Sequence, residues 1–238
     1  MARMIELPEP DVIAELQGCY VINKPGGLLT QGPPGIDSLE LRIKSFVKKR
    51  DDKPGKVYLG VPHRLDRPAS GVMLFAKNIR AAKRIALQFQ ERTVTKTYWA
   101  VVEGEVLEAA GVWEDSMRKL PDQAKSEVCD ADHPKAQHAR LSFRVLAVKD
   151  KMSWLEIQLE TGRTHQIRLQ ASHRGHPILG DELYKSSAPF GPETLDTRKR
   201  WIALHARTIG FEHPMTQEQM EFSAELADHW GQLPFEFS

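Results

Sequence analysis

The chain has 238 residues, of which 41% are hydrophobic and 27% are charged, and this composition is typical of a globular protein with one or two domains. Its 33 Lys and Arg and 32 Asp and Glu leave a net charge of +1, so a nucleic-acid surface would have to be a local patch. No apolar run approaches membrane-spanning length, and the start lacks a signal-peptide core, which predicts a cytoplasmic protein. Two cysteines provide neither a disulfide framework nor a zinc pattern.

Residues 1–18 are polar, contain two prolines and show no clear element, so we expect a short extension before one domain of residues 19–238. Residues 19–22 are predicted to form a strand that ends in a turn at 23–27. A helix is predicted from Ser38, which can act as its N-cap because a serine side chain accepts a bond from the first turn.

The most informative stretch is residues 62–77. Its first half places Asp66 between Arg64 and Arg67 in a loop punctuated by proline and glycine, and its apolar second half predicts a buried strand. A carboxylate between two guanidinium groups should stay ionised, because opposite charge favours the charged form. Asp66 is therefore a candidate nucleophile or base. The alternative is a structural Arg–Asp pair in a turn, which the local sequence alone favours.

Further elements follow in order along the chain. Asn78 can cap a second helix, and the β-branched and aromatic residues of 93–104 predict a strand that contains Tyr98. Residues 105–135 are irregular and polar. Alternating apolar residues then predict strands at 141–145, 155–159, 204–211 and 220–222, with a helix between the second and third of these. We expect Thr164 to cap this helix, which would place Arg168 one turn later on the same face.

Residues 63–77, HRLDRPASGVMLFAK, resemble the HRLDxxTSGxxxxAK motif of the RluA family of pseudouridine synthases, with Ala69 where the family usually has Thr. Other strings resemble further family motifs in family order, and the resemblance extends from about Tyr20 to about Trp230. These strings are VINKPGGLL, VTKTYWAVVEG, TGRTHQIR, GHPILGDELY and LHARTIGFEHP. The resemblance implies an α+β fold with a mixed, largely antiparallel central sheet, flanking helices and a catalytic cleft.

Members of this family isomerise uridine in ribosomal or transfer RNA without a cofactor, and the motif aspartate is their nucleophile. The resemblance therefore implies that Asp66 is the nucleophile, that Tyr98 faces the uracil and that Arg168 pairs with Asp66. Arg163 is the second choice for that pairing. In the family, the GHPILGDxLY segment is a structural buttress. The family lysine that corresponds to Lys24 shapes the floor of the cleft, but a surface lysine beside a turn is equally compatible with the sequence here.

Further residues are expected to bind the substrate. The resemblance implies that Arg64 enters the base stack that the extruded uridine leaves, as its counterpart does in the family. Ile167 and Leu204 would provide flat apolar walls with Tyr98. The complete set of expected substrate-binding residues is Arg64, His63, Arg163, Ile167, Leu204 and Lys77. The implied partner is RNA, and we expect no metal, no cofactor, no membrane contact and a monomer. Residues 1–18 are too short for the S4-type RNA-binding domain that often precedes the family's catalytic domain.

Two alternatives to a pseudouridine synthase remain. One is a non-catalytic RNA-binding module with the same fold, which would tolerate changes at Asp66, Tyr98 and Arg168. The other is a glycoside hydrolase that uses Asp66, because the first bond broken in uridine isomerisation is also glycosidic. A hydrolase needs a second carboxylic acid, and no motif in the chain carries one.

Overall fold

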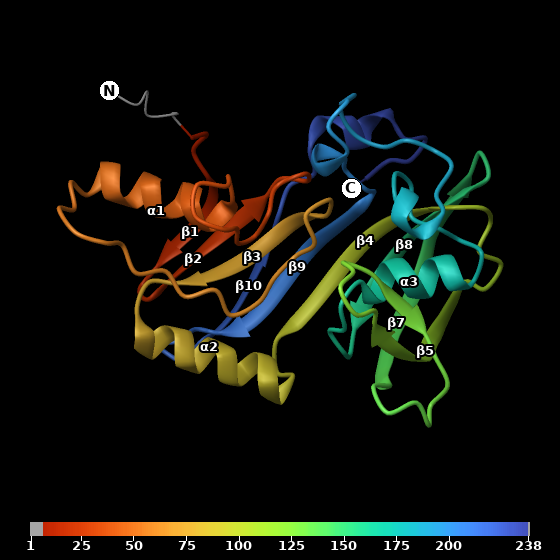
Figure 1. The fold of residues 1–238 in the computed structure, drawn as a ribbon, viewed down its shortest axis with the longest axis horizontal. Coiled ribbons are helices and arrows are strands. Elements are labelled where there is room, and N and C mark those ends of the chain that lie inside the picture. Colours follow the sequence, from red (N-terminus) through yellow and green to blue (C-terminus); the bar gives the residue numbers. More distant parts are fainter. Residues whose placement is uncertain (1–6, 238) are drawn as a thin grey trace.

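The computed structural model describes residues 7–237, and the strands within that range form one ten-stranded sheet (Figure 1). The strand order is β1-β2-β3-β9-β4-β8-β7-β5-β6, with β10 paired to β9. Only the β3–β9 pair is parallel in this sheet, so the expected mixed, largely antiparallel α+β fold is confirmed. The strands are β1 (Asp11–Leu16), β2 (Cys19–Lys24), β3 (Ser70–Ala76), β4 (Thr95–Glu103), β5 (Ala110–Lys119), β6 (Ser126–Val128), β7 (Gln137–Lys149), β8 (Met152–Leu159), β9 (Leu204–Glu212) and β10 (Gln219–Ser223).

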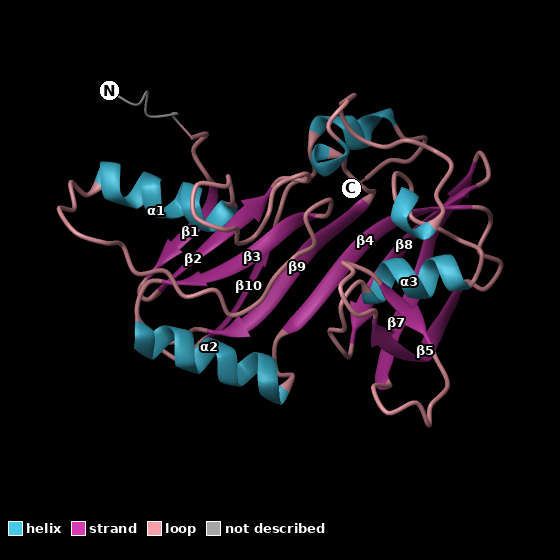
Figure 2. Ribbon diagram, viewed as in Figure 1, coloured by secondary structure: helices cyan, strands magenta, loops and turns pink. Residues whose placement is uncertain are grey.

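Helices accompany both halves of the sheet. Figure 2 shows α1 and α2 beside the half that contains β1 to β3, and α3 beside the half that contains β5 to β8. The expected N-caps of the first two helices are confirmed, because Ser38 accepts from the Leu41 N–H and Asn78 from the Ala81 N–H. The α-helices are α1 (Leu39–Arg50), α2 (Ile79–Glu91) and α3 (Gln166–His173). In residues 7–237 we find no helix with the length and apolarity that a membrane crossing requires.

Two stretches that were expected to lack structure contain strands. Within 1–18, β1 pairs with β2 along the edge of the sheet, whereas residues 1–6 lie outside the described part of the chain. Within 105–135, β5 and β6 form a hairpin, in which Trp113 and Met117 are buried. In 105–135 polar residues separate the few apolar ones, and in β1 the apolar Val12, Ile13 and Ala14 are consecutive, so neither stretch shows a clear alternation. Both predictions were wrong because pairing with a neighbouring strand decides the conformation there.

The start of α3 also differs from expectation. Thr164 precedes the helix and does not cap it; the N-cap is His165, whose backbone is left-handed with φ of 57° and whose side chain makes no cap bond. The Gln166 side chain organises this turn instead, since its Oε1 accepts from the Thr161 hydroxyl at 2.8 Å and from the Arg163 N–H at 3.0 Å. The spacing of Thr164 and Arg168 predicted the helix correctly. It could not show that the side chain bonded to the turn would be that of Gln166 and not that of Thr164.

The parallel pairing of β3 with β9 brings the distant motifs together. Gly71 lies opposite Ala206, and Ala206 in turn lies opposite Tyr98 on β4. A Cβ atom on Gly71 would lie 2.3 Å from the Ala206 carbonyl oxygen, and its φ of +119° is one that other residues rarely adopt, so only glycine allows this approach. As a consequence, the loop that precedes β3 and carries Asp66 lies over β4 and β9.

Candidate active site

A cleft of about 1710 Å³ runs between the two halves of the sheet. Its walls come from the loop before β3, from β4, from the turn that begins α3 and from the loop before β9, so all of the long sequence motifs contribute to it. Typical small-molecule pockets measure about 300–1,000 Å³, which makes this cleft large enough for a nucleotide and its neighbours in a polymer.

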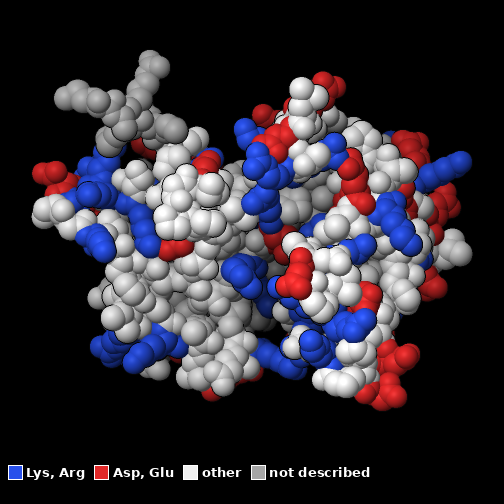
Figure 3. All heavy atoms as spheres, viewed as in Figure 1, with Lys and Arg blue, Asp and Glu red and all other residues white. Residues whose placement is uncertain are grey.

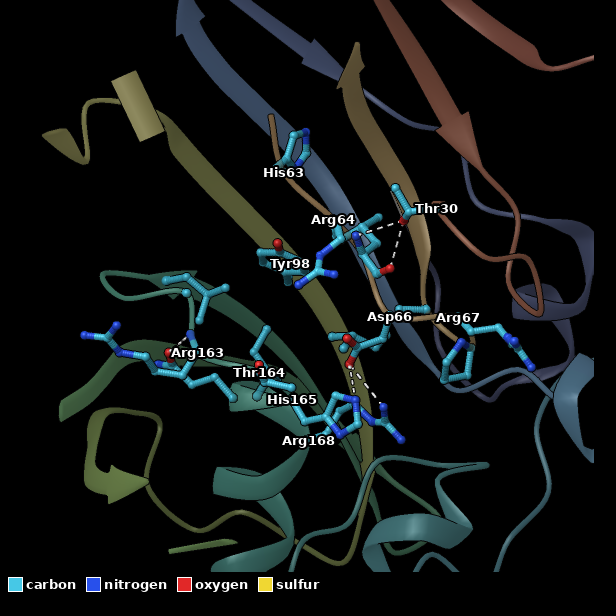
Figure 4. A pocket seen from close by; sticks show the side chains of 18 of the residues that line it. Thr30, His63, Arg64, Asp66, Arg67, Tyr98, Arg163, Thr164, His165 and Arg168 are labelled. Carbon is cyan, nitrogen blue, oxygen red and sulfur yellow. Dashed lines mark hydrogen bonds and ion pairs between the residues drawn. The ribbon is translucent and has the colours of Figure 1, made fainter. Parts of the chain in front are cut away.

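Asp66 lies in this cleft and contacts residues from α3 (Figure 4). Its Oδ2 accepts a hydrogen bond from Arg168 Nη1 at 3.1 Å and lies 3.7 Å from His165 Nε2. The flanking Arg64 and Arg67 point away from the carboxylate, Arg64 toward Tyr98 and Arg67 to the opposite side. The expectation that these two neighbours hold Asp66 was therefore wrong, because successive side chains of an extended loop point in different directions. The ion pair expected between Asp66 and Arg168 is present.

Arg168 is held mainly by Asp181, a residue that the sequence did not single out. Its Nε and Nη2 bind the two Asp181 oxygens at 2.6 and 2.7 Å, and only 5% and 1% of the two side chains are exposed. Burial opposes the charge of Arg168, but the bonds and charge of Asp181 outweigh it and raise the pKa of Arg168. Asp181 belongs to the GHPILGDELY segment, so this contact agrees with a buttress role for that segment.

His165 was also missed as a site residue, because no role was expected for it from the sequence. Its ring lies in the cleft between Asp66 and Tyr184, with Nδ1 3.0 Å from the Tyr184 hydroxyl oxygen. In the described residues, no three His, Cys, Asp or Glu side chains come together as metal ligands.

The apolar part of the cleft lining includes Tyr98, Ile167 and Leu204, all of which are buried. Burial, and secondarily the charge of Asp66, raises the pKa of Tyr98, so its phenol is protonated at neutral pH and can donate a hydrogen bond. All three residues line the same cleft, and their contact with the uracil stays a prediction.

Buried polar side chains brace the loop around Asp66. The Thr30 hydroxyl donates to the Leu65 carbonyl at 2.9 Å and accepts from the Leu65 N–H at 3.3 Å. Lys24 is fully buried and its ammonium donates to the carbonyls of Pro25, Leu28 and Arg67. The loop thus has two anchors outside its own sequence.

These anchors matter because position 69 lacks the hydroxyl that is usual in the family. Ala69 is buried, and its N–H closes the turn by donating to the Asp66 carbonyl at 3.2 Å.

Burial lowers the pKa of Lys24 to about 7, although the charge of Asp66 opposes this. A surface lysine was an open alternative for Lys24, and its complete burial contradicts that alternative.

His63 lines the cleft but its ring is occupied. Its Nε2 accepts the Leu74 N–H at 2.9 Å, and its ring stacks on Phe89 with centroids 4.6 Å apart. Burial lowers the pKa of His63 to about 3, so the ring is neutral and its proton is on Nδ1. His63 thus fastens the loop to β3 and presents the ring edge to the cleft.

Two expected substrate-binding residues lie elsewhere than expected. Lys77 does not reach the cleft. It forms an ion pair of 2.6 Å with Glu15, which lies on β1, a strand that the sequence did not predict. Arg163 lines the cleft, but its Nε donates to the His138 carbonyl and its side chain points away from Asp66 (Figure 4). The choice of Arg168 over Arg163 as the partner of Asp66 therefore agrees with the geometry.

Positive charge is concentrated around the cleft even though the chain is nearly neutral. Figure 3 shows Lys and Arg side chains around the hollow at the centre of this face. Nine of the cleft-lining residues are basic and four are acidic. The basic ones are Arg64, Arg67, Arg92, Lys96, Lys119, Arg163, Arg168, Arg198 and Arg200, and the acidic ones are Asp66, Glu160, Asp181 and Glu182. The local patch that a neutral nucleic-acid-binding protein would require is thus present.

Comparison with known proteins identifies the class. Residues 18–173 match the RNA pseudouridylate synthase family. The chain is 35% identical over 231 residues to the ribosomal large subunit pseudouridine synthase D of Haemophilus influenzae, covering 94% of this chain and 69% of that one. It is 33% identical over 233 residues to an uncharacterized RNA pseudouridine synthase of Bacillus subtilis, covering 95% of this chain and 73% of that one.

The fold agrees with these matches. The structure of human RNA pseudouridylate synthase domain containing 4 superimposes with a TM-score of 0.74 at 24% identity, over 92% of this chain and 89% of that chain. The chain belongs to the RNA pseudouridylate synthase family. It is accordingly an isomerase that converts uridine in RNA to pseudouridine.

Proposed function

We propose that this protein modifies uridine in the RNA of the large ribosomal subunit, with Asp66 as its nucleophile. The observation that carries the assignment is the position of Asp66. It lies in a cleft lined by more basic than acidic residues, it accepts a hydrogen bond from Arg168, and the cleft also contains the buried Tyr98. The choice of RNA is supported by the relatives that are named for the large ribosomal subunit.

The reaction is balanced within the substrate. The N1–C1′ bond of uridine breaks, a C5–C1′ bond forms, and one proton leaves C5 while N1 gains one, with no change in oxidation state. A nucleophilic carboxylate can hold the intermediate by attack at C1′ or at C6 of the ring, and both routes need an ionised, aimed Asp66. Arg168 supplies the opposite charge and the position.

The uracil has to turn over while it is detached, so its pocket needs flat walls. The apolar side chains of Tyr98, Ile167 and Leu204 provide such walls, and the protonated phenol of Tyr98 can donate to a ring oxygen or take part in proton transfer. A uridine in folded RNA must first leave its stack, as base-modifying enzymes require. Arg64 is exposed on the cleft rim beside Tyr98 and is suited to occupy the vacated position.

The concentration of basic side chains favours a polyanionic substrate over a free nucleoside. Phosphate contacts supply most of the sequence-independent affinity for nucleic acids, and they make binding dependent on salt. The excess of basic over acidic residues in the cleft lining supports such contacts. A ribosomal substrate agrees with the cytoplasmic location expected for the chain. The cytoplasmic location, the monomeric state and the absence of membrane contact all remain predictions.

The test is the Asp66→Asn variant in a tritium-release assay on ribosomal RNA that carries 5-³H-uridine. We expect no tritium release from Asp66→Asn, because the amide keeps the shape but is not a nucleophile, and RNA affinity within about twofold of the wild type. Glu108→Gln removes an exposed carboxylate outside the cleft and should behave as the wild type. Release by Asp66→Asn at the wild-type rate would contradict the assignment of the nucleophile, and wild-type protein that binds ribosomal RNA without any release would contradict the choice of RNA.

A further inference from the structure

The position of His165 at the start of α3 is unusual for a helix N-cap. Its backbone is left-handed, a conformation that costs energy for any residue with a Cβ and that persists only where the surroundings enforce it. Its side chain does not cap the helix. The ring extends into the cleft instead, where Figure 4 shows it beside Asp66 and Arg168, and only 11% of the side chain is exposed.

The Tyr184 hydroxyl determines which ring nitrogen of His165 carries the proton. The Tyr184 oxygen accepts the Ser126 N–H at 2.9 Å. Its own proton can go to His165 Nδ1 at 3.0 Å or to the Ser126 carbonyl at 3.3 Å, and the shorter contact is to the histidine. Burial lowers the pKa of His165, although Asp66 opposes this, so the ring is neutral. With Nδ1 as acceptor, the single ring proton is on Nε2.

Nε2–H then faces the nucleophile. It lies 3.7 Å from Asp66 Oδ2, the same oxygen that accepts from Arg168 Nη1. Within residues 7–237, both polar contacts of this carboxylate are on Oδ2. A distance of 3.7 Å is too long for a hydrogen bond, but such contacts in ligand-free enzymes are often long and shorten when substrate binds.

We propose that His165 is a positioning residue: its Nε2–H, together with Arg168, holds Oδ2 of Asp66, so that Oδ1 remains free and aimed at the uridine. This inference rests on the proposed role of Asp66 as nucleophile. It connects the β6 strand to the reaction, because Ser126 orients Tyr184, Tyr184 orients His165, and His165 orients Asp66. The alternative is that His165 only completes the turn before α3.

Substitutions at position 165 separate these two roles. Glutamine places an amide N–H at the position of the histidine Nε2, whereas asparagine reaches only the position of Nδ1 but tolerates the left-handed backbone better. Phenylalanine keeps the ring and removes both nitrogens. A positioning role therefore predicts that His165→Gln is more active than His165→Asn, and a structural role predicts the opposite order.

The measurement is single- and multiple-turnover pseudouridine formation on 5-³H-uridine RNA, with a melting curve for each variant. We expect His165→Asn and His165→Phe to lower kcat about 10- to 100-fold with KM unchanged within about twofold, since misplacement of a reacting group costs up to about a hundredfold. His165→Gln should recover kcat to within about fivefold of the wild type. Tyr184→Phe removes the proton donor to Nδ1 and should also lower kcat.

The inference is overturned if His165→Asn is as active as His165→Gln, or if the variants change KM alone. Asp66→Asn is measured in the same series to keep the two proposals separate. An active Asp66→Asn would refute the proposed nucleophile itself. An inactive Asp66→Asn together with wild-type rates for all of the His165 variants would refute only the positioning role.

Discussion

Arg168 is bound more closely by Asp181 than by Asp66. Two bonds of 2.6 and 2.7 Å join its guanidinium to Asp181, and one bond of 3.1 Å joins it to Asp66. The buried Asp181 therefore sets the position of the guanidinium, and an N–H of Nη1 is presented to the proposed nucleophile. A two-point contact of this kind also limits rotation of the arginine, which a single bond would allow.

Loss of the Asp181 charge should destabilise the fold. Asp181→Asn leaves a buried guanidinium without its main partner, and breaking a buried ion pair costs about 3–5 kcal/mol of the free energy of unfolding. Urea unfolding of the variant and of the wild type measures the difference. Asp196→Asn, which removes the charged partner of the exposed Arg198, provides the control and should unfold at the wild-type urea concentration. Equal stabilities of Asp181→Asn and the wild type would show that Asp181 is not the anchor of Arg168.

Substitution of Arg168 should impair the reaction more than substitution of Arg163. Arg168→Ala frees Asp66 from its attack geometry, and we expect a loss on the order of a hundredfold in single-turnover rate. Arg168→Lys should recover part of the rate, because lysine restores the charge but not the fork that binds two acceptors. Arg163→Ala removes a side chain that bonds to the His138 carbonyl and should change the rate less. The reverse order of Arg168→Ala and Arg163→Ala would mean that the wrong arginine is assigned to Asp66.

Lys24 should make stability depend on pH in the alkaline range. Its pKa is about 7 in the folded protein and 10.5 ordinarily, so between these values the unfolded chain binds a proton that the folded protein does not. The free energy of unfolding therefore rises with pH across this window, by up to about 1.4 kcal/mol per pH unit, and this contribution is lost toward pH 7.

The Lys24→Met variant lacks this titration. The stability difference, wild type minus Lys24→Met, should increase by roughly 2–3 kcal/mol between pH 7.5 and pH 9.5 in urea unfolding. Lys48→Met, at an exposed lysine of α1, is the matched control and should show a constant difference. A constant difference for Lys24→Met as well would mean that the buried ammonium stays charged throughout, held by its three carbonyl acceptors.

RNA binding should depend on salt through the basic side chains of the cleft. Lys119 is exposed and lines the cleft, so Lys119→Gln should weaken binding and reduce the slope of log K against log salt by about one. Lys149→Gln removes an exposed lysine that does not line the cleft, and it should leave the slope unchanged. Filter binding of ribosomal RNA fragments at several salt concentrations measures both slopes. Equal slopes for the two variants would place the RNA outside this cleft.

Much of the fold could be predicted locally. Caps at Ser38 and Asn78 marked two helices correctly, and alternating apolar residues marked the strands that are buried on at least one face. The hairpin within 105–135 and the edge strand β1 were missed, because neither shows a clear apolar alternation and both are stabilised by pairing with neighbouring strands. Lys77 was expected at the substrate because it ends the family motif, whereas its partner Glu15 lies on the strand that was missed.

Sequence motifs were sufficient for the class of the protein, for Asp66 as the candidate nucleophile and for Arg168 as its partner, because each motif is a short string with its own chemistry. They could not show that Asp181 anchors Arg168, that Lys24 and Thr30 brace the loop, or that His165 faces Asp66. Arg168 and Asp66 are 102 positions apart, and they meet through the strand order β3-β9-β4-β8, which places the loop before β3 near the turn after β8. Such contacts depend on strand order and on backbone angles such as that of His165, which the assembled sheet imposes and a local pattern does not encode.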